Sequence, residues 1–430
     1  MLSAADNELL TRTGPNTGMG DYFRRYWLPV ALSRELPEPD GPPIRVRIMG
    51  EDLLAFRATD GCVGLIAPRC AHRGADLFYG RNEECGIRCA YHGWKYGVDG
   101  KCTEMPNVPA GAAYHGKMRV QAYPTREFGE FVWAYMGPAD KLPEMPQMEF
   151  GLVPETHRYS SKKLQQCNWA QSVEGALDTA HFSFLHMPAP KVADTFHPDA
   201  NADQKRLQRM RQDPMPRFTL ANHDAGFVAG AARYGDPGEL YWRISQFMLP
   251  NHSLAPNALP GENYQGQTWV PIDAESCWIY TYVWNPERPL TAAERAKMDT
   301  GHGVLAELGP GFVPLRNRNN DYLLDREEQK HRSFTGIKGV AEQDAMIQDS
   351  QGLIADRTTE HLTGTDAATV HFRRAMLNGV KELREGKEPA AAKNGAAYCL
   401  RSGSWIAKES TAFEAVMVER FHDPAGRVKK

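Results

Sequence analysis

Four potential metal ligands lie in two short, similar segments of this chain, and they limit its possible folds more than any other part of the sequence. The segments are CAHRGA at 70–75 and CAYHGW at 89–94, and each contributes one thiol and one imidazole. Together they form the pattern C-x-H-x16-C-x2-H, made of Cys70, His72, Cys89 and His92. The two segments are therefore expected to come together around one shared metal group.

Two kinds of metal group take this donor set. A [2Fe–2S] cluster can have two Cys on one iron and two His on the other, and the neutral imidazoles raise its reduction potential. A structural zinc site also takes two sulfurs and two nitrogens, but zinc fingers usually pair like ligands, C-x2-4-C followed by H-x3-5-H. Each segment here pairs one Cys with one His. The spacing therefore favours the cluster, with zinc as the alternative.

The motif resembles that of the Rieske proteins, and the resemblance is local but specific. Respiratory-chain members of that family carry an extra Cys in each loop, which form a disulfide, and a membrane anchor. Ala75 and Tyr91 occupy the equivalent positions here, so that disulfide cannot form. The resemblance therefore implies the low-potential, oxygenase-like branch.

Composition excludes several classes of partner. The chain has 50 basic and 53 acidic residues and a formal net charge of −3, which does not indicate a nucleic-acid or membrane partner. The first 15 residues are polar and contain Gly and Pro, unlike a signal peptide, and no run of about 18 apolar residues follows. The other cysteines have no framework spacing, so reduced thiols in the cytoplasm are expected. These are Cys62, Cys85, Cys102, Cys167, Cys277 and Cys399.

The periodicity of the chain predicts two domains. Residues 40–66 alternate apolar and polar side chains, as short antiparallel strands do, and 130–138 looks like a closing strand. The Pro-rich stretch 138–150 is a plausible boundary. We expect a small all-β domain at 1–150 and a second domain at 151–430.

The second domain is expected to mix helices and strands, which makes the whole chain α+β. A helix is predicted at 168–186, where apolar residues fall at helical intervals and Pro188 forces an end. Helical stretches return near 290–300, 340–355 and 365–386. The strand-like segments between them are GFVAGAARY, YWRISQFML, QTWVPI and SCWIYTYVW.

The predicted helix at 168–186 carries a second group of potential ligands, E-x3-D-x2-H-x4-H, made of Glu174, Asp178, His181 and His186. The first three lie at i, i+4 and i+7, on one helical face. His186 reaches the same metal as His181 only if the helix unwinds or bends. Isolated His residues on a helix are more often packed in a core, but an electron-transfer cluster needs an acceptor. Two His and one carboxylate form the facial triad of non-haem Fe(II) oxygenases.

The two motifs together resemble the Rieske non-haem iron oxygenases, specifically the catalytic (alpha) subunits of the single-subunit-type group that includes phthalate dioxygenase. The opening DNELLTRTGPNTGMGDYFRRYWLPV and the run AEQDAMIQDSQGLIADRTTEHLTGTD also match, so the resemblance covers nearly the whole chain. It implies an all-β Rieske domain followed by a helix-grip domain, an antiparallel sheet with helices. It also implies one [2Fe–2S] cluster and one Fe2+ per chain.

The third iron ligand follows from the same resemblance. In that family it is an Asp just before an x-Met pair, which corresponds to Asp344 in D-A-M. Its rivals are Glu342, Asp349 and Asp356, which are otherwise expected to be ordinary charges on an exposed helix.

The resemblance gives Asp178 a catalytic role without metal ligation. It implies that Asp178 lies between His181 on the iron and a cluster ligand matching His92 from a neighbouring subunit. The chemistry is reasonable, because a ligating His usually donates its other N–H to a carboxylate that orients the ring.

The expected partners follow from the need for electrons. No G-x-G-x-x-G segment opens a helix after a strand, so this chain is not expected to bind a nicotinamide. The resemblance implies a separate NAD(P)H-dependent reductase of the flavin and iron–sulfur type. Electron transfer between subunits implies a head-to-tail ring, a trimer or a stacked hexamer.

The candidates for substrate binding are arginines and aromatic residues. Arg provides a bidentate fork for carboxylates. Arg243, on a strand-like segment, is the first candidate, and Arg206 and Arg209 come second because KRLQRMRQ could equally be a solvated basic loop. The apolar candidates, which are more often plain core residues, are Phe182, Phe184, Phe247, Met248 and Trp269.

The favoured function is a terminal oxygenase that dihydroxylates an aromatic carboxylate, phthalate or a substituted benzoate, and this substrate class comes from the resemblance. A monooxygenase or O-demethylase with the same centres is the close alternative. A Rieske electron carrier with a C-terminal scaffold does not explain the second ligand group. A zinc-stabilised binding protein is the remaining alternative, and metal analysis separates it from the others.

Overall fold

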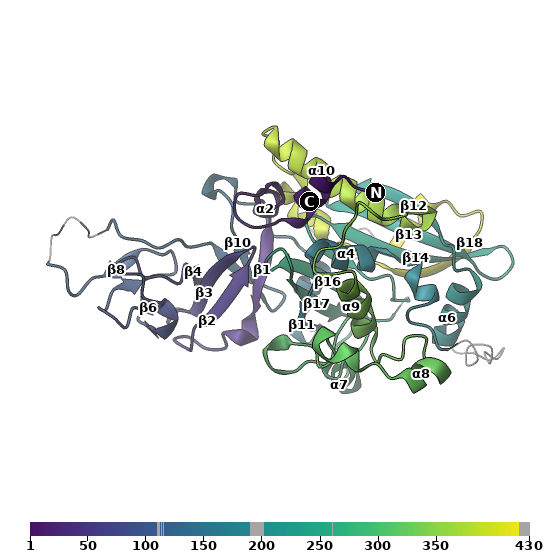
Figure 1. Cartoon of the computed structure of the whole chain (residues 1–430), viewed down its shortest axis with the longest axis horizontal. Coiled ribbons are helices and arrows are strands. Elements are labelled where there is room, and N and C mark those ends of the chain that lie inside the picture. The colour runs from purple at the N-terminus through teal and green to yellow at the C-terminus, as the bar shows by residue number, and fades with distance from the viewer. Residues whose placement is uncertain (110–111, 113, 115, 190–201, 260, 421–430) are drawn as a thin grey trace. The chain divides into compact units, whose positions relative to one another are not determined.

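The chain folds into two compact units, Thr13–Pro143 and Met1–Arg12 together with Glu144–Lys430. The computed structural model (Figure 1) describes residues 1–109, 112, 114, 116–189, 202–259 and 261–420. The change of unit after Pro143 falls inside the Pro-rich stretch 138–150. The first twelve residues, which include helix α1 (Ala4–Thr11), belong to the second unit and pack against two of its helices.

The first unit is built from short antiparallel strands, as predicted. They form three small sheets with the orders β1-β10-β9, β2-β3-β4 and β5-β6-β7-β8. Helix α2 (Gly18–Phe23) precedes them. The strands are β1 (Trp27–Leu32), β2 (Ile44–Ile48), β3 (Glu51–Arg57), β4 (Val63–Ile66), β5 (Arg81–Glu83), β6 (Gly86–Arg88), β7 (Lys95–Tyr96), β8 (Cys102–Glu104), β9 (Thr125–Phe128) and β10 (Phe131–Tyr135). One buried apolar cluster includes Phe56, Ile87 and the two ligand cysteines, Cys70 and Cys89.

The second unit contains one large antiparallel sheet, as predicted. Its order is β11-β17-β16-β15-β14-β13-β12, and β18 also pairs with β14. The four strand-like segments of the sequence lie in β13, β14, β16 and β17. The strands are β11 (Arg158–Gln165), β12 (Arg217–His223), β13 (Gly226–Tyr234), β14 (Glu239–Met248), β15 (His252–Leu254), β16 (Tyr264–Pro271), β17 (Cys277–Trp284) and β18 (Gly403–Lys408).

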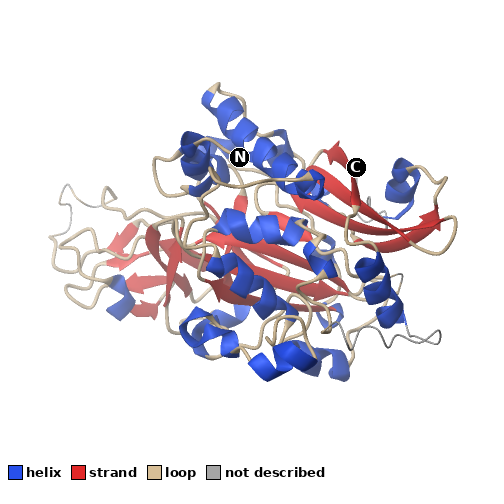
Figure 2. Ribbon diagram, turned by 45° about the vertical axis from the view of Figure 1, so that its right-hand side comes forward, coloured by secondary structure: helices blue, strands red, loops and turns tan. Residues whose placement is uncertain are grey.

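Helices cover this sheet, and Figure 2 shows them in blue against the red strands. Helix α4 packs on β15 and β16, α10 packs on β12, and α9 packs against α4. The helices are α3 (Glu149–Leu152), α4 (Trp169–Leu177), α6 (Ala202–Gln212), α7 (Ala292–Asp299), α8 (Arg326–His331), α9 (Val340–Ser350), α10 (Ala367–Arg384) and α11 (Phe413–Arg420). The helices expected near 290–300, 340–355 and 365–386 are therefore present.

The prediction of a helix at 168–186 was wrong for the second half of that range. Asn168 caps α4 by accepting the Ala170 N–H at 3.0 Å, and Trp169, Val173 and Leu177 are buried. The helix ends at Leu177, where the Asp178 side chain accepts the Ala180 N–H at 2.7 Å and starts a separate turn. Short acidic side chains compete in this way with the backbone of a helix. Glu174, Asp178 and His181 therefore do not share one helical face.

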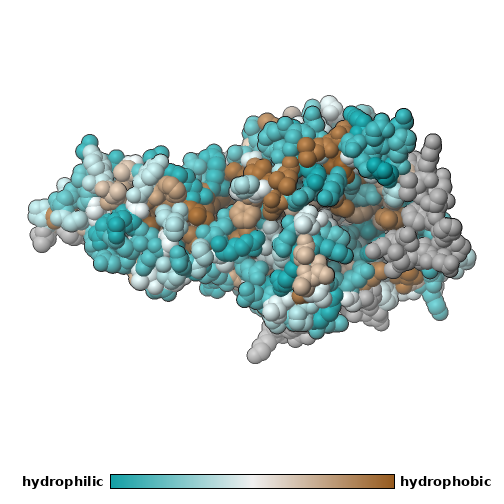
Figure 3. Space-filling model, turned by 90° about the horizontal axis from the view of Figure 1, so that it is seen from below, coloured by the Kyte–Doolittle hydropathy of each residue, from teal (hydrophilic) through white to brown (hydrophobic). Residues whose placement is uncertain are grey.

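No described helix is both long and apolar enough to cross a membrane. On the face drawn in Figure 3, hydrophilic side chains predominate and hydrophobic ones gather in smaller groups.

Candidate metal centres

The two ligand loops of the first unit have the same backbone design. The Gly74 N–H donates to the Cys70 carbonyl at 2.8 Å, and the Gly93 N–H donates to the Cys89 carbonyl at 2.9 Å. Both glycines have a positive φ, 72° and 75°, a conformation that costs glycine little and other residues more. These closed turns let each loop present its Cys and its His toward the other loop.

The four ligand side chains are paired like with like across the two loops. The thiols of Cys70 and Cys89 interact, and burial together with this contact raises the pKa of the Cys89 thiol. The rings of His72 and His92 lie 4.5 Å apart, and His72 stacks on Trp94 at 4.7 Å. The Nδ1 atom of His92 is buried without a hydrogen-bond partner, as expected of an atom that ligates a metal.

This pairing separates the two kinds of metal group. A single tetrahedral zinc would bring all four ligand atoms within about 4 Å of one another. Among the described residues, His181, His186 and Asp344 are the only three whose ligand atoms lie within 4.8 Å of one another, so the four loop ligands do not converge on one point. Two sulfurs on one side and two nitrogens on the other fit the two irons of a [2Fe–2S] cluster.

A tyrosine donates into the cluster site. Tyr96 Oη lies 3.2 Å from Cys70 Sγ and accepts the Ala71 N–H at 3.0 Å. A cysteine that ligates iron is a thiolate without a proton, so the Tyr96 hydroxyl would be the donor to the sulfur. Hydrogen bonds to ligand sulfurs are one means by which a protein sets the potential of a cluster.

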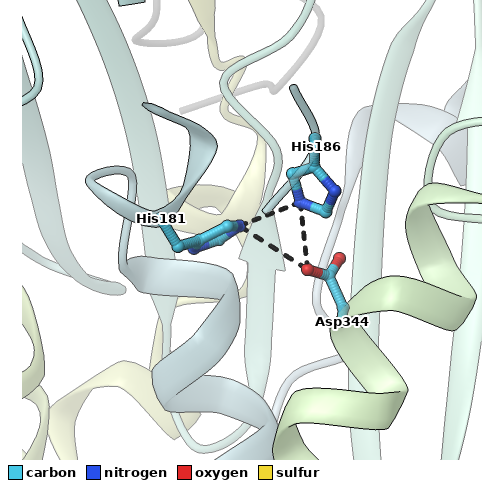
Figure 4. Close-up of side chains that lie close together, drawn as sticks. All are labelled: His181, His186 and Asp344. Carbon is cyan, nitrogen blue, oxygen red and sulfur yellow. Dashed lines mark hydrogen bonds and ion pairs between the residues drawn. The ribbon is translucent and has the colours of Figure 1, made fainter. Parts of the chain in front are cut away.

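The second centre combines two distant parts of the chain (Figure 4). His181 begins the short turn His181–Ser183, His186 follows it, and Asp344 comes from α9. The two Nε2 atoms are 3.1 Å apart, and Asp344 Oδ1 lies 3.5 Å from that of His181 and 3.1 Å from that of His186. Ligands at right angles around one metal lie about 3 Å apart. The structure thus brings together a facial set of two imidazoles and one carboxylate.

The charges in this set favour metal binding. Burial opposes ionisation of Asp344, but the neighbouring His186 and His181 keep the pKa of its carboxyl below the usual value. An ionised carboxylate with two neutral imidazoles is the ligand set that suits Fe(II).

A glutamine that the sequence did not single out orients His186. Gln343 Oε1 lies 2.6 Å from His186 Nδ1, and Gln343 Nε2 donates to the Ile337 carbonyl at 2.8 Å. Because the amide nitrogen is committed to Ile337, the amide oxygen must accept the Nδ1 proton. That leaves the lone pair of His186 Nε2 facing the metal position. The position of Gln343 directly before Asp344 was the only signal in the sequence.

Asp178 lies beside the other ligating imidazole. Its Oδ1 atom accepts the backbone N–H groups of Ala180 and, at 3.4 Å, His181, while its Oδ2 atom lies 3.7 Å from His181 Nδ1. Burial raises the pKa of Asp178, but His181 and the two N–H groups together lower it below the usual value. Asp178, His181 and Asp344 also line one pocket of 240 Å³ to which α4, α9 and α10 all contribute. The contact of Asp178 with a neighbouring subunit stays a prediction.

The structure separates the substrate-binding candidates. Phe182 lies 4.6 Å from the rings of both His181 and His186, and the Arg243 guanidinium lies 4.0 Å above the Phe182 ring. Phe247 instead packs in the core against Phe227 and Phe372.

The other apolar candidates have contacts of their own. Trp269 is buried and donates to Ser172 Oγ on α4 at 2.9 Å, and Met248 is buried. Phe184 is half exposed and lies beside Phe334. Phe182 is therefore the apolar candidate that contacts the iron ligands.

The three candidate arginines differ in their partners. Arg206 and Arg209 lie on helix α6, not in a basic loop. Each has an acidic partner, Glu262 at 3.4 Å and Asp236 at 3.3 Å. Arg243 is buried in β14, and its Nε and Nη2 atoms donate to Thr179 Oγ1 and Asn257 Oδ1. Among the described residues no carboxylate pairs with Arg243.

Two of the rival carboxylates were wrongly expected to be exposed. Asp349 is buried, accepts the Gln165 amide at 2.6 Å and binds the Tyr322 hydroxyl. Glu342 is buried and accepts the Glu307 N–H at 3.0 Å. A buried carboxylate requires hydrogen-bond partners. The partners of these two residues connect α9 to Gln165 and to the Glu307 backbone. Asp356 is exposed, as expected.

Comparison with known proteins agrees with this architecture. The Rieske [2Fe-2S] domain family matches residues 26–124, and the LigXa C-terminal domain-like family matches residues 134–414. The oxygenase subunit of phthalate 4,5-dioxygenase from Pseudomonas putida is 39% identical over 395 residues, 90% of this chain and 88% of that protein. The oxygenase subunit of 3-chlorobenzoate-3,4-dioxygenase from Comamonas testosteroni is 34% identical, covering 98% and 99% of the two chains.

Relatives with another reaction type also match. The oxygenase subunit of 5,5'-dehydrodivanillate O-demethylase from a Sphingobium species is 30% identical over 91% of this chain and 83% of that protein. The fold is shared with dicamba monooxygenase in complex with dicamba, with a TM-score of 0.55, 16% identity and coverage of 85% and 99% of the two chains.

The family models and relatives together span nearly the entire chain, and both ligand sets lie within the matched regions. The chain therefore belongs to the Rieske non-haem iron oxygenases, as an alpha subunit of the type that acts on aromatic compounds.

Proposed function

We propose that this chain is the terminal oxygenase that dihydroxylates an aromatic carboxylate, with electrons from a separate NAD(P)H-dependent reductase. The observation that carries the proposal is Arg243, a buried guanidinium beside Phe182 with no carboxylate partner among the described residues. A buried cation without a counter-ion is costly, so an anionic ligand would stabilise it. The relatives that act on phthalate and 3-chlorobenzoate support the same substrate class.

The residues of the chain have separable roles in this function. An iron on the triad of Figure 4 would supply dioxygen activation, and the [2Fe–2S] cluster would supply an electron. Gln343 holds the Nδ1 proton of His186, so the same imidazole presents its other nitrogen. Arg243 would bind the carboxylate of the substrate, and Phe182 would pack against its ring and exclude water.

An O-demethylase or monooxygenase acting on an aromatic acid is the second candidate. It is favoured by the O-demethylase relative, and it needs the same two centres and the same anion-binding residue. The two reactions differ in their products.

Product analysis tests the proposal. Purified chain, a compatible reductase and NADH are incubated with phthalate, substituted benzoates and methoxybenzoates under ¹⁸O₂, and products are measured by mass. Dihydroxylation predicts a product that contains two labelled oxygen atoms. One labelled atom, or release of formaldehyde, would establish the second candidate. Turnover of none of these acids would contradict both.

Arg243→Ala tests the anion site directly. Loss of a charge-assisted bidentate contact is expected to weaken phthalate binding by about 10- to 100-fold while iron content stays the same. Arg209→Ala is the control, because Arg209 already pairs with Asp236 at the surface. Phthalate titrations of both variants measure the effect, and an unchanged affinity in Arg243→Ala would remove Arg243 from the site.

A further inference from the structure

Thr179 occupies a position that connects the candidate substrate anchor to the candidate metal centre. It lies between Asp178 and the iron ligand His181 in the turn that follows α4. It is buried, with 2% of its surface exposed. Hydrogen bonds close the turn around it, because the Asp178 N–H donates to the Glu174 carbonyl and Asp178 Oδ1 accepts the N–H groups of Ala180 and His181.

Two buried arginines hold Thr179 through different atoms. Arg243 Nε donates to the Thr179 hydroxyl at 2.8 Å, and Arg233 Nη2 donates to its carbonyl at 2.7 Å. Both guanidinium groups are buried, and among the residues that the structure describes neither forms an ion pair, although the charges of Asp213 and Asp178 act on Arg233. Arg233 was not singled out from the sequence, although a charged residue inside the apolar segment GFVAGAARY was a usable signal.

The sheet places the two arginines side by side. Arg233 on β13 pairs with Tyr241, and Arg243 on β14 pairs with Ala231, so the arginines are diagonal neighbours on two adjacent strands. Burial and the nearby charge of Arg243 lower the pKa of Arg233 to about 10. At neutral pH both remain charged, and Thr179 is a hydrogen-bond partner that the two arginines share.

We propose that Thr179 is the positioning residue that relays carboxylate binding at Arg243 to the Asp178–His181 segment of the iron site. This inference rests on the proposed function, because it takes Arg243 to be the substrate anchor. A carboxylate that binds at this position attracts the Arg243 guanidinium. That guanidinium is hydrogen-bonded to the Thr179 hydroxyl, so Thr179 moves with it. Asp178 Oδ1 is bonded to the backbone of the two residues after Thr179, so a displacement of Thr179 moves Asp178 and His181 with it, while Arg233 holds the carbonyl as a pivot.

The relay predicts a specific separation of effects. A ligand shifts a conformational equilibrium only through interactions that differ between the two states. Removing the Thr179 hydroxyl removes the link between anchor and metal site but leaves the guanidinium, its bond to Asn257 and the iron ligands in place. Substrate binding should therefore survive while its effect on the iron site is lost.

The test compares Thr179→Val with Thr179→Ser in the complete oxygenase with both metal groups. Valine has the shape of threonine without the hydroxyl, and serine keeps the hydroxyl. Thr281→Val, a buried threonine on β17, is the control for loss of a buried hydroxyl elsewhere. Each protein is titrated with phthalate, and the iron site is probed by the EPR spectrum of its nitric oxide adduct with and without phthalate. The oxidation rate of the reduced cluster by dioxygen is measured with and without phthalate as well.

The expected result for Thr179→Val is a phthalate dissociation constant within threefold of wild type, unchanged iron content and no phthalate-induced change in the EPR spectrum. The acceleration of cluster oxidation by phthalate should fall at least tenfold. Thr179→Ser and Thr281→Val should behave as wild type.

Two results would overturn the relay. The first is a Thr179→Val protein that responds to phthalate as wild type does, and the second is a parallel loss of affinity and response, which would make Thr179 only a support for the anchor. If wild type itself binds neither phthalate nor a substituted benzoate, the proposed substrate class fails and the relay fails with it. If the wild-type protein responds to phthalate and Thr179→Val gives either of the first two results, the relay is refuted but the proposed function is not.

Discussion

At the scale of single residues, hydrogen-bond partners decide which of several similar carboxylates does what. Asp344, Asp349 and Glu342 all lie on α9 within two turns of one another. Asp344 faces two imidazoles, whereas Asp349 and Glu342 are occupied by Gln165 and by the Glu307 N–H. The spacing of the charges along the chain does not distinguish them, and their environments do.

Asp178→Asn tests the role of the negative charge beside His181. The amide oxygen can still accept the Ala180 and His181 N–H groups, so the turn and both metal groups should be retained. If Asp178 bridges the two centres as proposed, loss of the charge removes that route, and turnover should fall by about 100-fold, the upper end of the effects found for residues that orient metal ligands. Stopped-flow oxidation of the reduced cluster by dioxygen plus substrate measures it. Oxidation at the wild-type rate would refute the bridging role.

Gln343→Leu tests the orientation of His186. Without the amide oxygen the Nδ1 proton has no acceptor, and the affinity for Fe(II) should fall by about 10- to 100-fold. Ferrous titration of metal-free protein, with the cluster content followed by its visible absorption, gives the measurement. Gln351→Leu, at the exposed residue that follows α9, is the control and should bind iron normally. Equal affinities in the two variants would show that Gln343 does not orient the ligand.

At the scale of elements, an ion network holds the helix that leads into the iron site. Glu174 on α4 accepts from Arg357 Nε at 2.9 Å and from Arg373 Nε at 2.7 Å. Arg373 on α10 also binds Glu360 through two nitrogens, at 2.6 and 2.7 Å. Both arginines are buried. The network connects α4 to α10 one turn before Asp178.

Glu174→Gln should destabilise this unit. Removing one partner of a buried pair leaves Arg357 uncompensated and is expected to cost about 3–5 kcal/mol in the free energy of unfolding. Burial raises the pKa of Glu174, but Arg357 and Arg373 outweigh it and lower that pKa below the usual value. The stabilisation is therefore present at neutral pH, and the difference between wild type and variant should shrink as the pH falls through the lowered pKa.

Urea unfolding followed by tryptophan fluorescence at pH 7 and at acid pH measures that difference. Glu8→Gln, which removes an exposed pair with Arg12 on α1, is the control and should cost under about 1 kcal/mol. Equal stabilities of the two variants at pH 7 would show that the network contributes little.

The prediction for α4 illustrates what periodicity misses. The apolar positions of 168–186 were read correctly as helical up to Leu177. The capping of Ala180 by Asp178 is a local hydrogen bond that apolar spacing does not report. The resulting unwinding is what lets His181 and His186, five residues apart, meet at 3.1 Å.

At the scale of the whole molecule, the proposed electron transfer between subunits can be tested by complementation. Cys89→Ala removes a cluster ligand, and His181→Ala removes an iron ligand, so each variant alone should be inactive. If electrons cross between protomers of a ring, co-expressed variants that mix at random should recover about one quarter of wild-type activity per site. Product formation by the co-purified assembly measures this. Activity that stays at zero in mixed assemblies would place the transfer within one protomer and contradict the ring.

Metal analysis of the whole protein checks the assignment of both centres. Two irons in the cluster and one on the triad give three irons per chain, with matching acid-labile sulfide and negligible zinc. Two irons per chain would leave the triad without its metal, and zinc without iron would contradict the cluster.

Local sequence patterns were enough to predict the donors of the first centre and the general architecture. Cys70, His72, Cys89 and His92 lie in two short loops whose turns depend on local glycines, and strand periodicity identified the sheets of both units. Asp344 was found only through resemblance to a family, because no spacing rule connects it to ligands more than 150 residues earlier. The tertiary structure alone decided the contacts of Gln343 with His186 and of Arg233 and Arg243 with Thr179. Such contacts depend on strand register and on the packing of α9 against α4, which are set by the burial of many residues at once and not by the local chain.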